Sequence, residues 1–235
     1  MKTIFATPTI NFLPFGRHPI LVGVVGSHAY GLATDDSDID YRGCFVQSQF
    51  QRNGFGESSE TYDRLKPDVC LHELYKFMKL AASGNPNILE MFWLPENHYV
   101  KLKPAGKDLI YHRDLFLSQK VRLTYGGYAM SQIKRLEQRG DGSFSSKLRK
   151  RYSKHARHCF RLLNQGAEIL ATGNLTVRVK DPAKLFEIGE LPPEKLKELF
   201  DQEFERFNAI ESSLPEEPHW TKLSKLINDI RREYP

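Results

Sequence analysis

The fold class of this chain is decided by one stretch, Gly26-Ser27-His28-Ala29-Tyr30-Gly31-Leu32-Ala33-Thr34-Asp35-Asp36-Ser37-Asp38-Ile39-Asp40-Tyr41-Arg42-Gly43. It follows an aliphatic run, Ile20–Val25, that is rich in β-branched residues and therefore predicts a buried strand. It leads into a second apolar run, Ile39–Val46, which predicts another strand. A Gly-Ser turn and a short helix thus separate two predicted strands, and the second strand is entered through Asp-Ile-Asp.

Further elements are predicted directly downstream of this stretch. Asp68–Leu71, entered through Pro67, predicts a third strand, and the apolar spacing of Glu73–Ala82 predicts a helix after it. Gly84-Asn85-Pro86 combines a helix stop, an N-cap and a first-turn proline, so a helix is expected from Asn87 to Trp93.

Beyond Pro95, helical periodicity replaces the strand signal. The helices expected here cover residues 117–139, 148–172, 193–211 and 219–233. The sequence therefore predicts an α+β fold, with a small β-sheet core in residues 1–100 and a helical C-terminal region in residues 101–235.

The predicted helix at 148–172 has one apolar stripe, from Leu148 to Leu170. The residues expected on its opposite, polar face are Lys154, His158, Arg161 and Gln165. The helix lies in the most basic part of the chain, because residues 131–161 contain ten Lys and Arg but two Asp and Glu, against a net charge of +5 for the whole chain. Such a segment either attracts phosphate, nucleic acid or an anionic surface, or is a solvated helix face.

Three isolated cysteines, Cys44, Cys70 and Cys159, lack the paired spacing of a disulfide framework or a zinc site, which indicates a reducing compartment. No apolar run approaches membrane-spanning length, and no signal-peptide core is present. We therefore expect a soluble, cytoplasmic protein without a membrane partner. The sequence gives no indication of its oligomeric state.

The Asp-Ile-Asp sequence carries the first chemical signal. At the start of a strand, Asp38 and Asp40 alternate with one apolar residue and are expected to project from the same face. Neighbouring carboxylates repel each other unless a cation neutralises them, and hard oxygen ligands suit Mg²⁺ or Mn²⁺. The pair therefore predicts a divalent-metal site that also binds substrate phosphates.

The Gly-Ser turn carries the second signal. Gly26 and Ser27 come where a strand ends and a short helix begins, so backbone N–H groups without intrahelical partners are expected to face solvent. Glycine permits close approach to a phosphate, and the Ser27 hydroxyl can donate another hydrogen bond. Arg42 either reaches a phosphate as well or is the counter-charge of the two aspartates.

Together these features resemble the signature of the polymerase-β-type nucleotidyltransferase superfamily, in which Gly-Ser precedes Asp-x-Asp. The similarity extends over roughly residues 18–180 to the YcgL/RlaP-type branch, predicted nucleotidyltransferases linked to RNA repair. The segments that carry this further similarity are His18-Pro19, Arg42-Gly43, Lys76-Phe77, Gly84-Asn85-Pro86-Asn87, Glu90, Lys154-His155, His158 and Arg161-Leu162-Leu163.

The resemblance implies that residues 1–100 form a nucleotidyltransferase core on a small mixed β-sheet. It also implies a third carboxylate on a neighbouring strand. We expect Asp68, because it opens the third strand and shares a face with Cys70 and His72, while Asp63 and Glu73 remain alternatives. It also implies in-line attack of an acceptor hydroxyl on the α-phosphorus of a nucleoside triphosphate, with release of pyrophosphate. The implied metal ligands and catalytic residues are Asp38, Asp40 and Asp68, and the implied nucleotide-binding residues are Gly26, Ser27, Arg42, Lys154, His158 and Arg161.

Three functions are compatible with this site. The first is a transferase that moves a nucleoside monophosphate to an RNA end, which the basic segment favours. The second is a protein-modifying, adenylylating transferase of a toxin–antitoxin type. The third is a non-catalytic nucleic-acid-binding relative, which the presence of both Asp38 and Asp40 disfavours. The identity of the triphosphate, the need for a template and the acceptor are left open.

Overall fold

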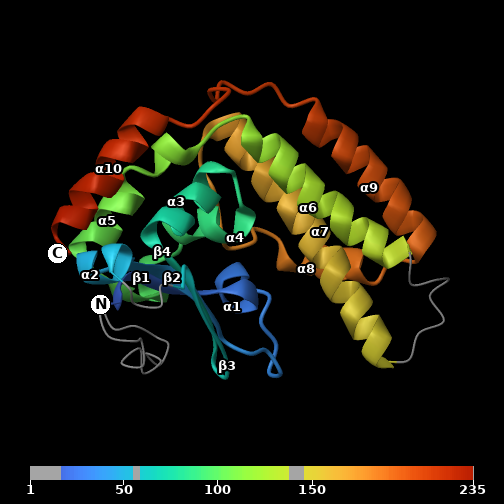
Figure 1. Ribbon diagram of the computed structural model, residues 1–235. Coiled ribbons are helices and arrows are strands. Elements are labelled where there is room, and N and C mark those ends of the chain that lie inside the picture. Colours follow the sequence, from blue (N-terminus) through green and yellow to red (C-terminus); the bar gives the residue numbers. More distant parts are fainter. Residues whose placement is uncertain (1–16, 55–58, 138–145, 235) are drawn as a thin grey trace. The chain divides into compact units, whose positions relative to one another are not determined.

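The computed structural model describes residues 17–54, 59–137 and 146–234, without the side chains of residues 137 and 146–148. The chain forms two compact units (Figure 1). The first unit runs to Leu117 and resumes at Glu217, and the second is Ser118–Glu216. We expected a domain boundary near residue 100, whereas the first unit extends to Leu117 and also includes the C-terminal helix. The reason is that the segment after the sheet and the C-terminal helix both pack against elements of the first unit.

The first unit is built on a five-stranded mixed sheet. Its strands are β1 (Arg17–Val25), β2 (Asp40–Gln47), β3 (Thr61–Leu65), β4 (Asp68–Glu73) and β5 (Tyr99–Leu102), in the order β3-β4-β2-β1-β5. β2 and β4 are parallel, and the other pairs are antiparallel. The small mixed sheet predicted from the sequence is confirmed, whereas β3 and β5 were not predicted.

One face of this sheet forms an apolar core. Its buried members are Val22, Val24, Tyr41, Phe45, Val69 and Leu71. Side chains alternate between faces along a strand, so the even-numbered residues of β2 and β4 near the start of each strand lie on the opposite face. The predicted polar residues and the apolar core therefore occupy different sides of the same two strands.

Short helices connect and cover the strands of the first unit. They are α1 (Gly26–Tyr30), α2 (Gln49–Asn53), α3 (Leu74–Ala82), α4 (Pro86–Leu89), α5 (Pro104–Tyr111), α10 (Trp220–Arg232) and the 3₁₀ turns Glu90–Phe92, Glu96–His98 and Arg113–Phe116. Asn85 caps α4 by accepting a hydrogen bond from the Asn87 N–H, as predicted. The helix expected at Asn87–Trp93 is a single α-helical turn followed by a 3₁₀ turn. α10 packs against α3, and Figure 1 shows it beside α5.

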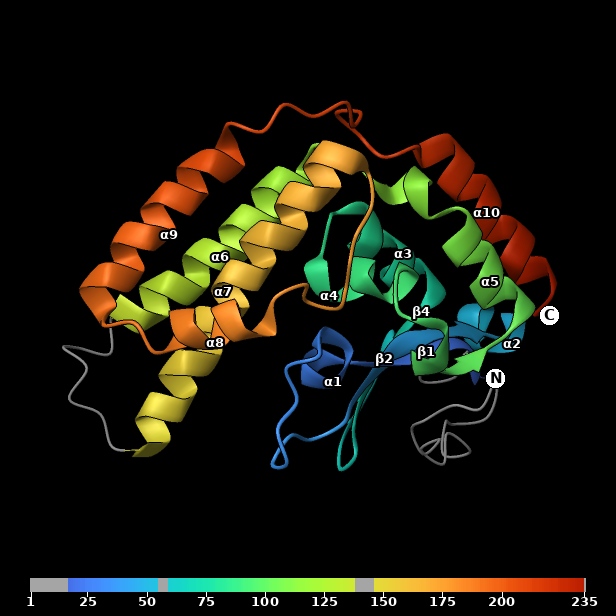
Figure 2. The same cartoon turned by 180° about the vertical axis from the view of Figure 1, so that it is seen from behind.

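The second unit is helical. It contains α6 (Lys120–Glu137), α7 (Ser146–Thr172), α8 (Pro182–Gly189) and α9 (Pro193–Asn208), of which α6, α7 and α9 were predicted. Residues 138–139 of the expected first helix and the Leu148 side chain lie outside the described residues. α6 and α7 lie side by side, and α8 packs across α7 (Figures 1 and 2). Within the described ranges, no helix is both long and apolar enough to cross a bilayer.

The polar face predicted for α7 needs a correction. The stripe is buried as expected at Tyr152, Ala156, Cys159, Leu163 and Leu170. Arg161 and Gln165 are also buried, however, at 2% and 5% exposure, whereas Lys154 is exposed. The reason is a second layer of chain: Gln165 Nε2 donates to the carbonyls of Thr176 and Val177, each at 3.3 Å, in the segment that leads to α8. In helical periodicity, a face that packs against a polar backbone looks the same as a face that meets water.

Candidate active site

Two carboxylates lie next to each other at the starts of β2 and β4. Asp40 is the partner of Asp68 in the parallel register, so their side chains share one face on strands about 5 Å apart. Both residues are half-buried. The sequence predicted that Asp68 would share a face with Cys70 and His72, and the strand register confirms this.

Asp38 is not held on the strand as the sequence predicted. β2 begins at Asp40, so Asp38 precedes the strand, is exposed, and is not oriented by strand alternation. The approach is a turn in which the Ser37 N–H donates to the Thr34 carbonyl and the Thr34 N–H donates to Ser37 Oγ, both at 2.9 Å. His28 Nε2 lies 3.3 Å from the Ser37 carbonyl, which ties α1 to the same turn.

The Gly-Ser turn lies against the Asp40 carboxylate. Gly26 has φ +70°, a region that side chains disfavour, and an added Cβ would come within 2.4 Å of Asp40 Oδ2. No side chain from the N-cap residue, Val25, caps the first turn of α1, and Ser27 is half-buried. The glycine thus allows the backbone at the start of α1 and a carboxylate to be in immediate contact.

A buried hydrogen bond holds the other end of α1. Tyr30 Oη lies 3.0 Å from Glu90 Oε1 and 2.8 Å from Glu90 Oε2, and Glu90 is 2% exposed. The contact joins the helix after the Gly-Ser turn to the 3₁₀ turn after α4. Glu90 therefore helps to position α1.

Arg42 binds the third predicted carboxylate. Its Nη1 donates to Asp68 Oδ1 at 2.7 Å and its Nη2 to Asp68 Oδ2 at 3.4 Å, which is a bidentate pair. Burial alone would lower the Arg42 pKa, but the hydrogen bond and charge of Asp68 raise it above its ordinary value. Of the two roles predicted for Arg42, the structure shows the counter-charge: its ion-pair partner is Asp68, and the charge of Asp40 also raises its pKa.

The two alternative third carboxylates occupy other positions. Asp63 lies on β3, where it pairs with Cys70 of β4. Because β4 lies between β3 and β2, Asp63 is two strand spacings, roughly 10 Å, from the strand that carries Asp40. Glu73 lies on the opposite face of β4, is buried, caps α3 by accepting from the Tyr75 N–H at 2.7 Å, and pairs with Arg231. Asp68 remains the carboxylate nearest to Asp40 in the strand register.

A hydrogen-bonded chain that the sequence did not predict continues across β4 and β3. Lys76 Nζ donates to Thr61 Oγ1 at 2.7 Å, and Thr61 Oγ1 lies 3.1 Å from His72 Nδ1. Burial and the charge of Lys76 lower the His72 pKa, which favours a neutral ring. Burial and a hydrogen bond with Asp63 raise the Cys70 pKa to about 12, so its thiol stays protonated near neutral pH. These hydrogen bonds hold β3 against β4, and no motif in the sequence indicates them.

The candidates in the second unit do not form a single exposed basic face. Arg161 Nη2 lies 2.9 Å from His158 Nδ1, and Arg161 also bonds Gln165. Burial, with the charge of Arg161, lowers the His158 pKa to about 3, so His158 is neutral near pH 7. Of the three nucleotide-binding residues predicted in the second unit, Lys154, His158 and Arg161, Lys154 alone is exposed.

The side chains at the starts of β2 and β4 provide some of the ligands that a divalent cation requires. Carboxylates of Asp40 and Asp68 on one face provide the hard oxygen donors that Mg²⁺ or Mn²⁺ takes. Within the described residues, no three His, Cys, Asp or Glu side chains already gather around one point, and Arg42 occupies Asp68. Asp40 and Asp68 therefore offer the donor chemistry of a divalent-metal site in neighbouring strand positions, and Asp38 lies in the turn before β2.

A mixed sheet with a Gly-Ser turn against one of two adjacent carboxylates is the arrangement expected of the nucleotidyltransferase class. Residues 17–208 match the family described as RlaP, the RNA repair pathway DNA polymerase beta family. The match covers well over half of the 235 residues, and the chain belongs to this family.

Two individual proteins are also similar to the chain. An uncharacterized 38.9 kDa protein from the nrdC-mobD intergenic region of enterobacteria phage T4 is 30% identical over 127 residues, which is 49% of this chain. That match spans 38% of the phage protein, well under two thirds of its length. The crystal structure of a nucleotidyltransferase-like protein from Exiguobacterium sibiricum is 15% identical, with a TM-score of 0.32, over 94% of this chain and 75% of that one.

Proposed function

We propose that this chain is a metal-dependent nucleotidyltransferase that moves a nucleoside monophosphate from a nucleoside triphosphate to an acceptor hydroxyl at an RNA end. The observation that carries the proposal is the pairing of Asp40 with Asp68 on adjacent parallel strands, with Gly26 packed against the Asp40 carboxylate. Membership of a polymerase-β-type family supports the same chemistry.

Asp38, Asp40 and Asp68 would hold the divalent ions. When bound there, Mg²⁺ or Mn²⁺ would make the acceptor hydroxyl easier to deprotonate and stabilise the charge on the departing pyrophosphate. Backbone N–H groups at the Gly26-Ser27 turn would bind phosphate oxygens, and the Ser27 hydroxyl would donate one more hydrogen bond. Asp68, held by Arg42, would accept the proton of the attacking hydroxyl.

The test compares Asp40, at the start of β2, with Asp35 in the loop that precedes this strand. Asp40→Asn should retain the fold but lose metal-dependent nucleotide transfer by several orders of magnitude, because it removes a charge needed to hold the ions. Asp35→Asn removes the same charge from an exposed loop position and should transfer at the wild-type rate. Purified protein would be incubated with each labelled triphosphate, Mg²⁺ and total RNA. Near wild-type transfer by Asp40→Asn would refute the proposal.

RNA as the acceptor rests on the excess of positive charge in residues 131–161. Arg151 and Lys154 are exposed and lie three residues apart on α7, on one side of the helix. If both contact RNA phosphates, the double variant Arg151→Ala, Lys154→Ala should reduce the slope of log affinity against log salt by about 1.4 for single-stranded RNA. Lys195→Ala on α9 is the matched control. Equal slopes, or no RNA binding at low salt, would favour a protein acceptor.

A further inference from the structure

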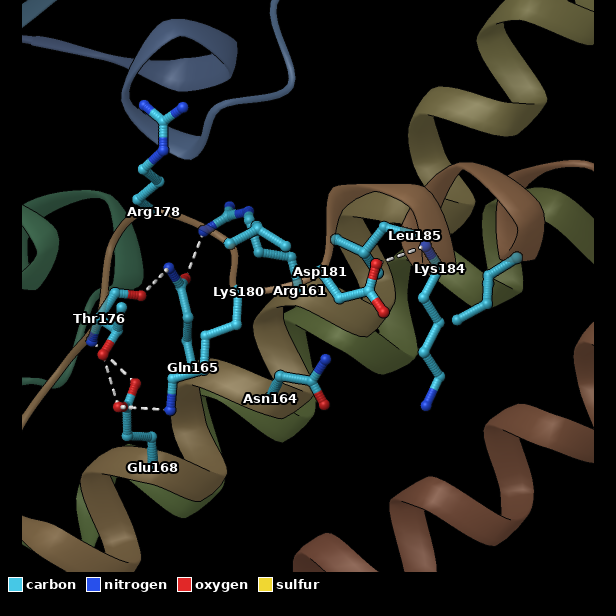
Figure 3. Close-up of a pocket in the computed structure, with 12 residues that line it drawn as sticks. Arg161, Asn164, Gln165, Glu168, Thr176, Arg178, Lys180, Asp181, Lys184 and Leu185 are labelled. Atoms are coloured by element: carbon cyan, nitrogen blue, oxygen red, sulfur yellow. Dashed lines mark hydrogen bonds and ion pairs between the residues drawn. The ribbon is translucent and has the colours of Figure 1, made fainter.

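The second unit contains a pocket of about 360 Å³. Among the residues predicted to take part in nucleotide transfer, Arg161 alone lines it. Its walls come from the second half of α7, the segment 176–181 and the first turns of α8 (Figure 3). The lining residues are Arg161, Asn164, Gln165, Glu168, Thr176, Arg178, Val179, Lys180, Asp181, Lys184, Leu185 and Ile188. All of them lie within the second unit.

Hydrogen bonds hold the walls of this pocket in place. Glu168 accepts from the Thr176 N–H at 2.8 Å and from Thr176 Oγ1 at 2.6 Å, while Gln165 binds the two carbonyls described above. Leu175, just before this segment, and Val177 within it are buried, at 5% and 2% exposure. The segment is therefore packed against α7, and these contacts within the protein shape the pocket.

The carboxylates of the pocket already have hydrogen-bond donors. Glu168 has the two contacts with Thr176 and an ion pair with Lys180 at 3.6 Å. Asp181 caps α8 by accepting from the Lys184 N–H at 3.0 Å. These acidic groups serve the local structure, and their acceptor capacity is partly used.

The cationic side chains are in surplus. Four of them, Arg161, Arg178, Lys180 and Lys184, line the pocket against two carboxylates. The side chains of Arg178 and Lys184 are exposed and make no hydrogen bond or ion pair with any residue in the described part of the chain. In Figure 3 they extend from opposite ends of the pocket, with Asn164 and Asp181 between them. The side chains of Arg178 and Lys184 are therefore available to donate hydrogen bonds to an anion.

We propose that this pocket binds the phosphate of a nucleotide. A phosphomonoester carries a charge of about −1.5 to −2 near pH 7, which matches the surplus of two cations, and its oxygens accept from both Arg and Lys. Arg178 offers a planar fork and Lys184 a point charge. Val179, Leu185 and Ile188 supply an apolar wall for the rest of the nucleotide. The phosphate belongs either to a free mononucleotide or to the 5′ end of an RNA.

The test measures binding by the full-length chain in EDTA, which suppresses metal-dependent binding at the carboxylate site. The probes are 5′-AMP and a short single-stranded RNA with and without a 5′-phosphate. Arg178→Ala, Lys184→Ala should weaken binding of the phosphorylated probe by about tenfold for each cation removed. Lys195→Ala, which removes an exposed lysine outside the pocket, should have no effect. Thermal unfolding of each variant checks that the helical unit remains folded.

The outcomes separate the two sources of phosphate. If AMP binds and the 5′-phosphate of the RNA makes no difference, the ligand is a free nucleotide. If the 5′-phosphate strengthens RNA binding and the double variant loses that gain, the ligand is an RNA end. Binding of neither probe at millimolar concentration, or equal binding by the wild type and the double variant, would overturn the proposal. Because EDTA is present, each result is independent of whether the chain transfers nucleotides.

Discussion

Replacing Gly26 by alanine should separate the stability of the fold from the chemistry of the candidate site. Gly26 has φ +70°, and the new Cβ would lie 2.4 Å from Asp40 Oδ2. Ordinary contacts begin at 3.4 Å, so the carboxylate would have to move by about 1 Å. A carboxylate can make such a movement by rotating, which costs the fold little. In an active site, a misplacement of about 1 Å can cost on the order of 100-fold in rate.

Gly173→Ala is the matched control for this substitution. Gly173 has φ +69°, and an added Cβ there would meet no atom within 4 Å. Both substitutions carry the strain of an alanine at positive φ, about 1–2 kcal/mol, less about 0.4–1 kcal/mol from restricting the unfolded chain. We therefore expect similar small losses in the free energy of unfolding, measured with urea.

The two variants should differ in nucleotide transfer. We expect Gly26→Ala to lose about 100-fold in metal-dependent transfer and Gly173→Ala to retain wild-type activity. Rates would be measured with labelled triphosphate under single-turnover conditions, so that binding and chemistry are separated. The reasoning is refuted if Gly26→Ala is as active as the wild type, or if Gly173→Ala loses as much activity.

Three further predictions follow from the contacts. Ser27→Ala should weaken triphosphate affinity by about tenfold, or 1.4 kcal/mol, in equilibrium titration, and an unchanged affinity would remove Ser27 from the site. A double-mutant cycle of Arg42→Ala and Asp68→Asn should give a coupling energy of about 0.2–1 kcal/mol, because both side chains are partly exposed; additive effects would mean that the pair is not formed in solution. The unfolded chain protonates His158 near pH 6.5 but the folded chain only near pH 3, so stability should fall as the pH drops from 7 towards 4, and His158→Gln should flatten that fall in urea unfolding at each pH.

Local patterns in the sequence were sufficient for the first, second and fourth strands. A run such as Ile20–Val25 is apolar on both faces because neighbouring chain covers both sides of its strand, and this leaves a contiguous signal. In the second unit, α6, α7 and α9 were predicted for a related reason, since a helix that packs on its neighbours must repeat apolar residues at the helical period. β3 was missed because Thr61–Leu65 is largely exposed and lacks any such run.

Proximity in space was beyond the reach of the sequence. Asp38 and Asp40 were expected to be equivalent, but the hydrogen-bonded strand begins at the second of them. The choice among Asp63, Asp68 and Glu73 depends on which strands are neighbours and in which register, and no local pattern carries that information. The Arg42–Asp68 ion pair depends on the same parallel register.

The sequence by itself determined the α+β class, the Gly-Ser turn and the Asp-x-Asp pair, because strand and helix periodicity and the chemistry of these residue types are local properties. Tertiary structure alone decided that Asp68 pairs with Asp40, that Arg161 is buried while Lys154 is exposed, and that Arg178 and Lys184 line one pocket. The physical reason is that burial, electrostatic pairing and cavity walls depend on segments distant in the sequence, whose separation is set by the packing of the whole unit.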